Sequence, residues 1–100
     1  MQIALIADQD TINGLMLAGV KHSAIFNPDN VEEKIQEFSK AKILVFTEKV
    51  GQYLRENNLI STIGNTYLEI PDKSGSSGQA MKKINELFEN AIGIVLKEDE

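Results

Sequence analysis

The stretch Ile3-Ala4-Leu5-Ile6-Ala7 decides the fold of this chain, and it runs directly into Asp8. Its five residues are all apolar, whereas a strand with one wet face alternates apolar and polar side chains. A continuous apolar run is typical of a central strand in a parallel sheet, where helices cover both faces. Ile43-Leu44-Val45-Phe46 has the same character. Both stretches therefore predict buried strands of a parallel sheet.

Two weaker strands and three helices are expected around these runs. Ser23-Ala24-Ile25-Phe26 and Thr66-Tyr67-Leu68-Glu69-Ile70 predict the further strands, and Pro71 ends the second of them. Between successive strands, apolar residues recur at helical spacing. They are Ile12, Leu15, Met16 and Ala18 in the first helix, Val31, Ile35 and Phe38 in the second, and Val50, Tyr53 and Leu54 in the third.

Helix ends are marked by residues with known capping preferences. We expect Asp10 or Thr11 to cap the start of the first helix, and Thr47 the start of the third. Gly19 is suited to the left-handed backbone that follows a helix. These signals place the helices directly after the apolar strands.

Strands that alternate with helices predict βαβ units with right-handed crossovers, so that helices cover both faces of the sheet. The predicted class is α/β, with a four-stranded parallel sheet of receiver-like or Rossmann-like topology, followed by a linker and a C-terminal helix. We divide the chain into an α/β globular domain (1–71), a flexible linker (72–78), and a C-terminal helix with an acidic tail (79–100). The linker is polar and rich in Gly and Ser.

The predicted C-terminal helix carries apolar residues at alternating steps of three and four, which is the spacing of a coiled-coil seam. These residues are Met81, Ile84, Phe88, Ala91 and Val95. The pattern is equally compatible with packing on the parent sheet and with binding to a partner helix. The linker counts against simple packing on the sheet, because connections within a compact domain are usually about two to six residues, but the pattern alone leaves the two alternatives equal.

Composition excludes several classes of protein. The chain has 100 residues, 15 of them acidic and 10 basic, a formal net charge of -5 and no cysteine. Broad nucleic-acid binding requires clustered Lys and Arg, so we expect no nucleic-acid partner. Disulfides and thiolate metal sites are excluded. We also expect no direct membrane insertion, because no apolar run reaches about 18 residues. The predicted location is cytoplasmic.

An acidic pair, Asp8 and Asp10, follows the first strand at the edge where open α/β sheets commonly bind ligands. Two carboxylates there are able to hold Mg²⁺, as in response-regulator receivers. A receiver also needs a phospho-accepting Asp after its third strand, where this chain has Phe46-Thr47-Glu48, and a late Lys, where it has Ile70-Pro71. The simpler interpretation is that Asp10 caps the helix while Asp8 accepts backbone hydrogen bonds.

Other motifs indicate no chemistry. Gly75-Ser76-Ser77-Gly78 lacks the Lys-Ser or Lys-Thr of a phosphate loop and is interpreted as a flexible tether. His22 is the sole histidine, with no Ser or Cys partner to form a triad. We therefore predict no catalytic residue, no cofactor and no resident metal.

The first strand and helix carry a recognisable motif. The segment Ile6–Val20 resembles the opening motif of the F subunits of archaeal A-type and vacuolar-type rotary ATPases, in which an acidic pair and Thr precede a glycine and Leu-Ala-Gly follows. The resemblance continues through Ile43–Val50, Leu68–Pro71 and Ala80–Phe88, and so covers nearly the whole chain. The residues that carry the motif are Asp8, Asp10, Thr11, Gly14 and Gly19.

The resemblance implies a central-stalk subunit without a catalytic site, in a complex that couples ATP hydrolysis or synthesis to ion transport. It implies binding to the coiled-coil rotor, which is the D subunit of such complexes, and a mobile C-terminal helix that extends toward the nucleotide-binding head and influences ATP turnover. The location implied is cytoplasmic and peripheral to the membrane. The resemblance thus favours a partner for the last helix, whose contact residues would be Met81, Ile84, Leu87, Phe88, Ala91 and Val95. The alternative is a degenerate receiver-like module that binds Mg²⁺ or phosphate at Asp8 and Asp10.

Overall fold

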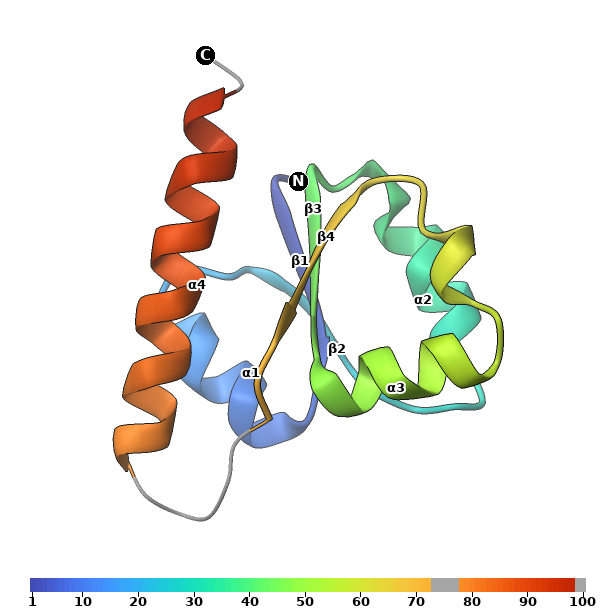
Figure 1. Ribbon diagram of the computed structural model, residues 1–100, viewed down its shortest axis with the longest axis horizontal. Coiled ribbons are helices and arrows are strands. Elements are labelled where there is room, and N and C mark those ends of the chain that lie inside the picture. Colours follow the sequence, from blue (N-terminus) through green and yellow to red (C-terminus); the bar gives the residue numbers. More distant parts are fainter. Residues whose placement is uncertain (73–77, 99–100) are drawn as a thin grey trace.

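Four parallel strands form one sheet in the computed structural model, which describes residues 1–72 and 78–98 (Figure 1). The spatial order is β2-β1-β3-β4. The strands are β1 (Ile3–Ala7), β2 (His22–Ile25), β3 (Ile43–Thr47) and β4 (Thr66–Ile70). The predicted α/β class and the parallel four-stranded sheet are confirmed. This strand order also places a topological switch point between β1 and β3.

The two apolar runs form the two central strands. Every residue of β3 is buried, as are four of the five in β1. The register aligns Leu5 with Val45 and continues across β4 to Leu68. Strands β2 and β4 lie at the edges and carry mixed burial, which explains why their sequences are less uniformly apolar. Strand β2 begins one residue earlier than predicted, at His22.

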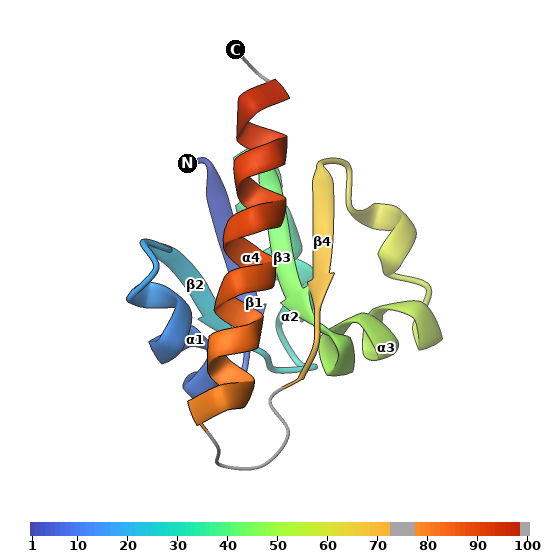
Figure 2. The same ribbon diagram turned by 60° about the vertical axis from the view of Figure 1, so that its left-hand side comes forward.

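Helices cover both faces of the sheet. Figures 1 and 2 show α1 (Gln9–Met16) and α4 (Gly78–Glu98) on one face, and α2 (Val31–Glu37) and α3 (Glu48–Glu56) on the other. Short 3-10 turns follow α2 at Phe38–Lys40 and precede β4 at Ile60–Thr62. No helix among the described residues is both long and apolar enough to cross a membrane.

The side chains of β1 and β3 alternate between two cores. The α2/α3 core lies on one face and comprises Ala4, Ile6, Val31, Ile35, Phe38, Ala41, Leu44, Phe46, Val50, Leu54 and Ile63. The α1/α4 core lies on the other face and comprises Leu5, Ala7, Ile12, Leu15, Val20, Ile43, Val45, Ile70, Ile84, Phe88 and Ile92. Because successive residues of a strand point to opposite faces, a continuous apolar run supplies both cores at once.

The ends of α1 and α3 differ in detail from the prediction. Asp8, and not Asp10 or Thr11, is the N-cap residue of α1. Gly19 has the expected left-handed backbone, with φ of 103°, two residues after the C-cap Leu17. Thr47 does occupy the N-cap position of α3, but its side chain makes no capping hydrogen bond. That task is performed by Asp72, whose Oδ2 accepts the Lys49 N–H at 2.9 Å from 23 residues away.

Candidate functional site

Helix α4 lies along the sheet and packs against α1 and β4. Within residues 82–93 of α4, whose side chains the structure describes, the buried residues are three apolar ones spaced four apart: Ile84 (2% exposed), Phe88 (2%) and Ile92 (7%). A spacing of four keeps side chains on nearly the same side of a helix. The helix therefore turns one narrow apolar stripe toward the sheet, and this stripe completes the α1/α4 core.

The stripe overlaps the predicted partner-binding residues only in part. Ile84 and Phe88 belong to both sets, but here they contact the chain's own sheet. Leu87 is 53% exposed and Ala91 is partly exposed. The side chains of Met81 and Val95 lie outside the described part of the structure. The arrangement is therefore the docked one of the two that the spacing allowed, and partner contacts of this helix stay a prediction.

One stripe residue, Ile92, was not among the predicted contact residues. The signal was present in the sequence, since Ile92 follows Phe88 by four residues. The alternating three- and four-residue spacing of a coiled-coil seam selects Ala91 in its place. The buried residues of α4 that face the sheet recur every four residues, so the coiled-coil spacing did not predict Ile92.

The connection to α4 is described at its two ends. Asp72 is held to the first turn of α3 by its hydrogen bond with the Lys49 N–H. Helix α4 begins at Gly78. The predicted linker, 72–78, therefore starts at an anchored residue, and its central part, 73–77, lies outside the described residues.

The family motif centres on Asp8 and Thr11 at the carboxyl end of β1. Asp8 Oδ2 accepts the Thr11 N–H at 3.1 Å, and Oδ1 accepts the Thr11 hydroxyl at 2.7 Å. Thr11 is fully buried. Both carboxylate oxygens are thus engaged in capping α1, so the acidic pair is split: Asp8 is a structural cap, and Asp10 lies on the exposed side of the first turn.

The pKa of Asp8 lies below its ordinary value, as the net result of opposing effects. Partial burial is the largest single effect and by itself would raise the pKa. The hydrogen bonds from the Thr11 hydroxyl and N–H, another from its own backbone and the charge of Lys49 together outweigh burial. The capping hydrogen bonds therefore favour the ionised form.

The remaining motif residues are spread along the chain from β1 to β2. Gly14 lies inside α1, while Gly19 follows that helix and leads toward β2. Within residues 1–72 and 78–98, no group of three or more His, Cys, Asp or Glu side chains is placed to hold a metal ion. In this structure the motif joins β1 to α1 and α1 to β2.

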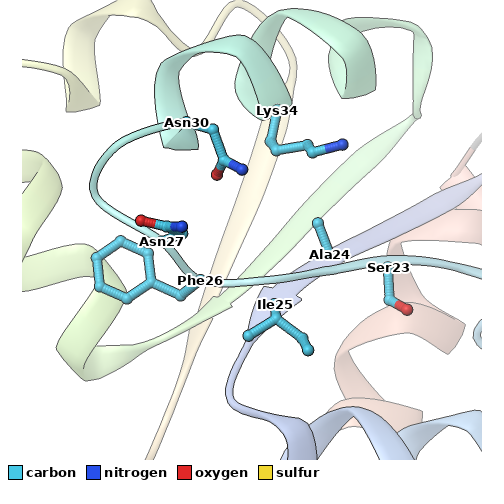
Figure 3. Close-up of a pocket in the computed structure, with 7 residues that line it drawn as sticks. All are labelled: Ser23, Ala24, Ile25, Phe26, Asn27, Asn30 and Lys34. Atoms are coloured by element: carbon cyan, nitrogen blue, oxygen red, sulfur yellow. The ribbon is translucent and has the colours of Figure 1, made fainter.

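A second surface feature is a shallow pocket of about 500 Å³ beside the edge strand β2 (Figure 3). It lies where β2 leads into α2, at the turn Asn27-Pro28-Asp29-Asn30. Asn27 Oδ1 accepts the Asp29 N–H at 3.0 Å and fixes that turn. The lining residues are Ser23, Ala24, Ile25, Phe26, Asn27, Asn30 and Lys34.

The pocket combines polar groups from α2 with the open edge of the sheet. Figure 3 shows Asn30, which precedes α2, and Lys34 of α2 on one side of the strand, with the Ile25 side chain on the opposite side. Lys34 Nζ contacts Glu37 Oε2 at 3.0 Å. The Asn30 Oδ1 atom is buried and accepts no hydrogen bond from any residue that the structure describes. Ile25, at the end of β2, is 56% exposed.

Comparison with known proteins agrees with this architecture. The family model described as ATP synthase (F/14-kDa) subunit matches residues 3–88, from β1 into α4. The A-type ATP synthase F subunit of Methanothermobacter thermautotrophicus is 34% identical, over 92% of this chain and 92% of its own. The corresponding protein of Methanosphaera stadtmanae is 32% identical, with the same two coverages. That of Methanococcus maripaludis is 30% identical, over 97% of this chain and its whole length.

The match includes both faces of the sheet, the Asp8–Thr11 cap and the helix that carries Ile84 and Phe88. The chain therefore belongs to the family of the ATP synthase (F/14-kDa) subunit.

Proposed function

We propose that this chain is the F subunit of an A-type ATP synthase and acts as a non-catalytic component of its central stalk. In this proposal the α/β domain (1–71) binds the coiled-coil rotor (the D subunit), and the C-terminal segment (79–100) regulates the coupling of ATP hydrolysis or synthesis to ion transport. The observation that carries the proposal is the narrow apolar stripe through which the described part of α4, residues 82–93, contacts the sheet.

A narrow stripe suits a helix that exchanges between two partners. Burying three side chains of this size stabilises the docked state by about 5–9 kcal/mol before the cost of ordering the helix is subtracted. The loss of backbone conformational entropy in the ordered helix opposes this stabilisation. A modest difference in affinity for a second partner is then enough to shift the helix. The contact residues we propose for the extended helix are those predicted above, Met81, Ile84, Leu87, Phe88, Ala91 and Val95.

The surface that we propose for the coiled-coil rotor is the β2–α2 region. It has an unpaired sheet edge, an exposed Ile25, and the pocket with the buried, unpartnered Asn30 Oδ1. Apolar exposure beside unsatisfied polar groups is a common property of interaction sites. Recognition residues also tend to lie in loops that a rigid scaffold positions, as the Asn27–Asn30 turn is here.

The receiver-like alternative is disfavoured by the engagement of Asp8. Its two carboxylate oxygens accept the two hydrogen bonds from Thr11, so binding of Mg²⁺ would compete with the cap of α1. Titration with Mg²⁺, followed by amide chemical shifts, tests this directly. Saturable shifts confined to Asp8, Asp10 and Thr47 would favour the alternative over the stalk proposal.

The stalk proposal is tested by calorimetric titration of the full chain into the purified coiled-coil rotor. We expect saturable binding by the natural chain and at least about tenfold weaker binding by Ile25→Asp, because a buried charge without a partner is costly at an interface. The matched control is Leu17→Asp, which changes a 91% exposed leucine after α1 and should bind within about twofold of the natural chain. Failure of the natural chain to bind would contradict the proposal.

A further inference from the structure

Asn85 is a polar residue beside the apolar stripe by which α4 contacts the sheet. It directly follows Ile84 and precedes Phe88 by three residues, so it lies on the flank of the stripe. Its Oδ1 atom is buried and accepts no hydrogen bond from the described residues. The same helix contains a second asparagine, Asn90, which is exposed. The two asparagines therefore differ in environment but not in residue type.

Burial of the Asn85 oxygen weakens the docking of α4. In water this atom accepts hydrogen bonds from solvent, and in the docked helix it loses them without a replacement. The free-energy cost of burying an acceptor without a hydrogen bond is larger than the net stabilisation that an average hydrogen bond provides. When α4 leaves the sheet, the carboxamide regains water, or it takes a donor from a partner helix. Hydration of the Asn85 Oδ1 atom thus favours the release of α4 from the sheet.

We infer that Asn85 is the residue that sets how often α4 leaves the sheet, because it holds the docked state close in free energy to the released state. The inference deepens the proposed function and rests on it for its biological meaning, since it concerns the regulation of the same helix. The effect of Asn85 on the docking of α4 is a property of the isolated chain and does not require a partner.

The test is amide hydrogen exchange on the full chain, with two pairs of matched variants. Asn85→Ala removes the carboxamide, and Asn85→Leu replaces it by an apolar side chain of similar size. Asn90→Ala and Asn90→Leu make the same changes on the exposed side and correct for helix propensity. The quantities compared are the protection of α4 amides and of β3 amides.

We expect at least one Asn85 variant to increase α4 protection by about tenfold beyond its Asn90 counterpart. Protection of β3 should change less, because release of α4 is local opening and not global unfolding. Asn85→Ala covers the case in which leucine is too bulky for the site. Equal changes in the Asn85 and Asn90 pairs would overturn the inference. So would α4 and β3 amides that exchange together in the natural chain.

Binding of the natural chain to the coiled-coil rotor separates this inference from the proposed function. If the Asn85 variants increase α4 protection but the natural chain does not bind the coiled-coil rotor, the stalk proposal is wrong and the role of Asn85 in docking stands. If the natural chain binds the rotor but the Asn85 and Asn90 variants change α4 protection equally, the stalk proposal stands and the inference about Asn85 is wrong.

Discussion

The two faces of the sheet are covered in different ways. Each of the helices α2 and α3 is preceded and followed along the chain by a strand of the sheet. On the other face, α1 is held in the same way, but α4 follows the last strand and no strand comes after it in the described chain. Both cores use alternate residues of the same two strands. Similar burial on the two faces therefore does not imply equal resistance to local opening.

The largest expected effect is on the α2/α3 core. Phe46→Ala should lower the free energy of unfolding by about 3–5 kcal/mol, because Phe46 is fully buried and its removal leaves a cavity. Urea unfolding followed by circular dichroism measures the loss. The matched control is Tyr67→Ala, since Tyr67 stacks on Phe46 at a centroid distance of 5.4 Å but is about half exposed. An equal loss in both variants would contradict the cavity explanation, because truncation of the half-exposed Tyr67 leaves a smaller buried cavity than truncation of Phe46.

A smaller effect on global stability is expected from the α1/α4 core. Changing Ile84 and Phe88 together to Asp should release α4, because neither charge tolerates burial. The loss cannot exceed the docking free energy of the helix, and we expect about 2 kcal/mol. Loss of α4 amide protection with retained β1 and β3 protection measures it. If the proposed function holds, the same variant also uncouples ATP turnover in the assembled complex.

The control for that release is a double change at the same spacing on the exposed side, Lys83→Asp with Leu87→Asp. Both residues are exposed, so α4 should stay docked. Complete unfolding of the Ile84 and Phe88 variant would remove the distinction between the two faces.

The cap at Asp8 should have an effect of about 1 kcal/mol that depends on pH. Asp8→Ala removes the acceptor of the Thr11 N–H and hydroxyl, and lost N-caps cost roughly this amount. The pKa of Asp8 is lowered by folding, so the ionised carboxylate contributes stability above its ordinary pKa of about 3.9. That contribution is lost as the pH falls through the folded-state pKa. Urea unfolding at pH 7 and at pH 3 measures both values.

Asp8→Asn provides the comparison for this pH dependence. Asparagine is also a good N-cap and keeps an oxygen acceptor, but it has no charge to titrate. The difference in stability between the natural chain and Asp8→Asn should therefore shrink at the lower pH. A difference that is constant between the two pH values would contradict the assignment.

The smallest effect expected is a gain from Gly93→Ala in α4. A Cβ atom at this position meets no atom within 4 Å, and alanine is favoured over glycine in a helix by about 0.5–1 kcal/mol. The gain should appear as increased protection of α4 amides, with the α2/α3 core unchanged. Reduced protection of α4 would contradict the open surroundings of Gly93.

Sequence patterns predicted what depends on near neighbours. The unbroken apolar runs identified β1 and β3 because each residue serves one of two cores, and the parallel arrangement followed from the alternation with helices. What the sequence left open was the partner of α4. Ile84 and Phe88 satisfy both a coiled-coil seam and a sheet contact, because either surface requires only an apolar stripe.

The capping residues show the same limit at smaller scale. Asp8, Asp10 and Thr11 are all acceptable N-caps, and only the point at which β1 ends decides between them. The cap of α3 by Asp72 was not predictable from local sequence, because 23 residues separate Asp72 from Lys49. The pocket likewise depends on β2 lying at an edge, which is a property of the strand order and not of any motif.

The hydrogen bond between Asp72 and Lys49 fixes a pivot for the whole C-terminal segment. From Asp72 to Gly78 the chain spans six residue steps, so the first residue of α4 stays within about 20 Å of the start of α3. The helix has 21 residues and is therefore about 32 Å long. Swung outward about this pivot, its far end reaches about 50 Å from α3, well beyond the radius of gyration of 12.8 Å. The pairing of Ile70 with Thr47 in the sheet and the hydrogen bond of Asp72 together limit how far the helix can reach from the α/β domain.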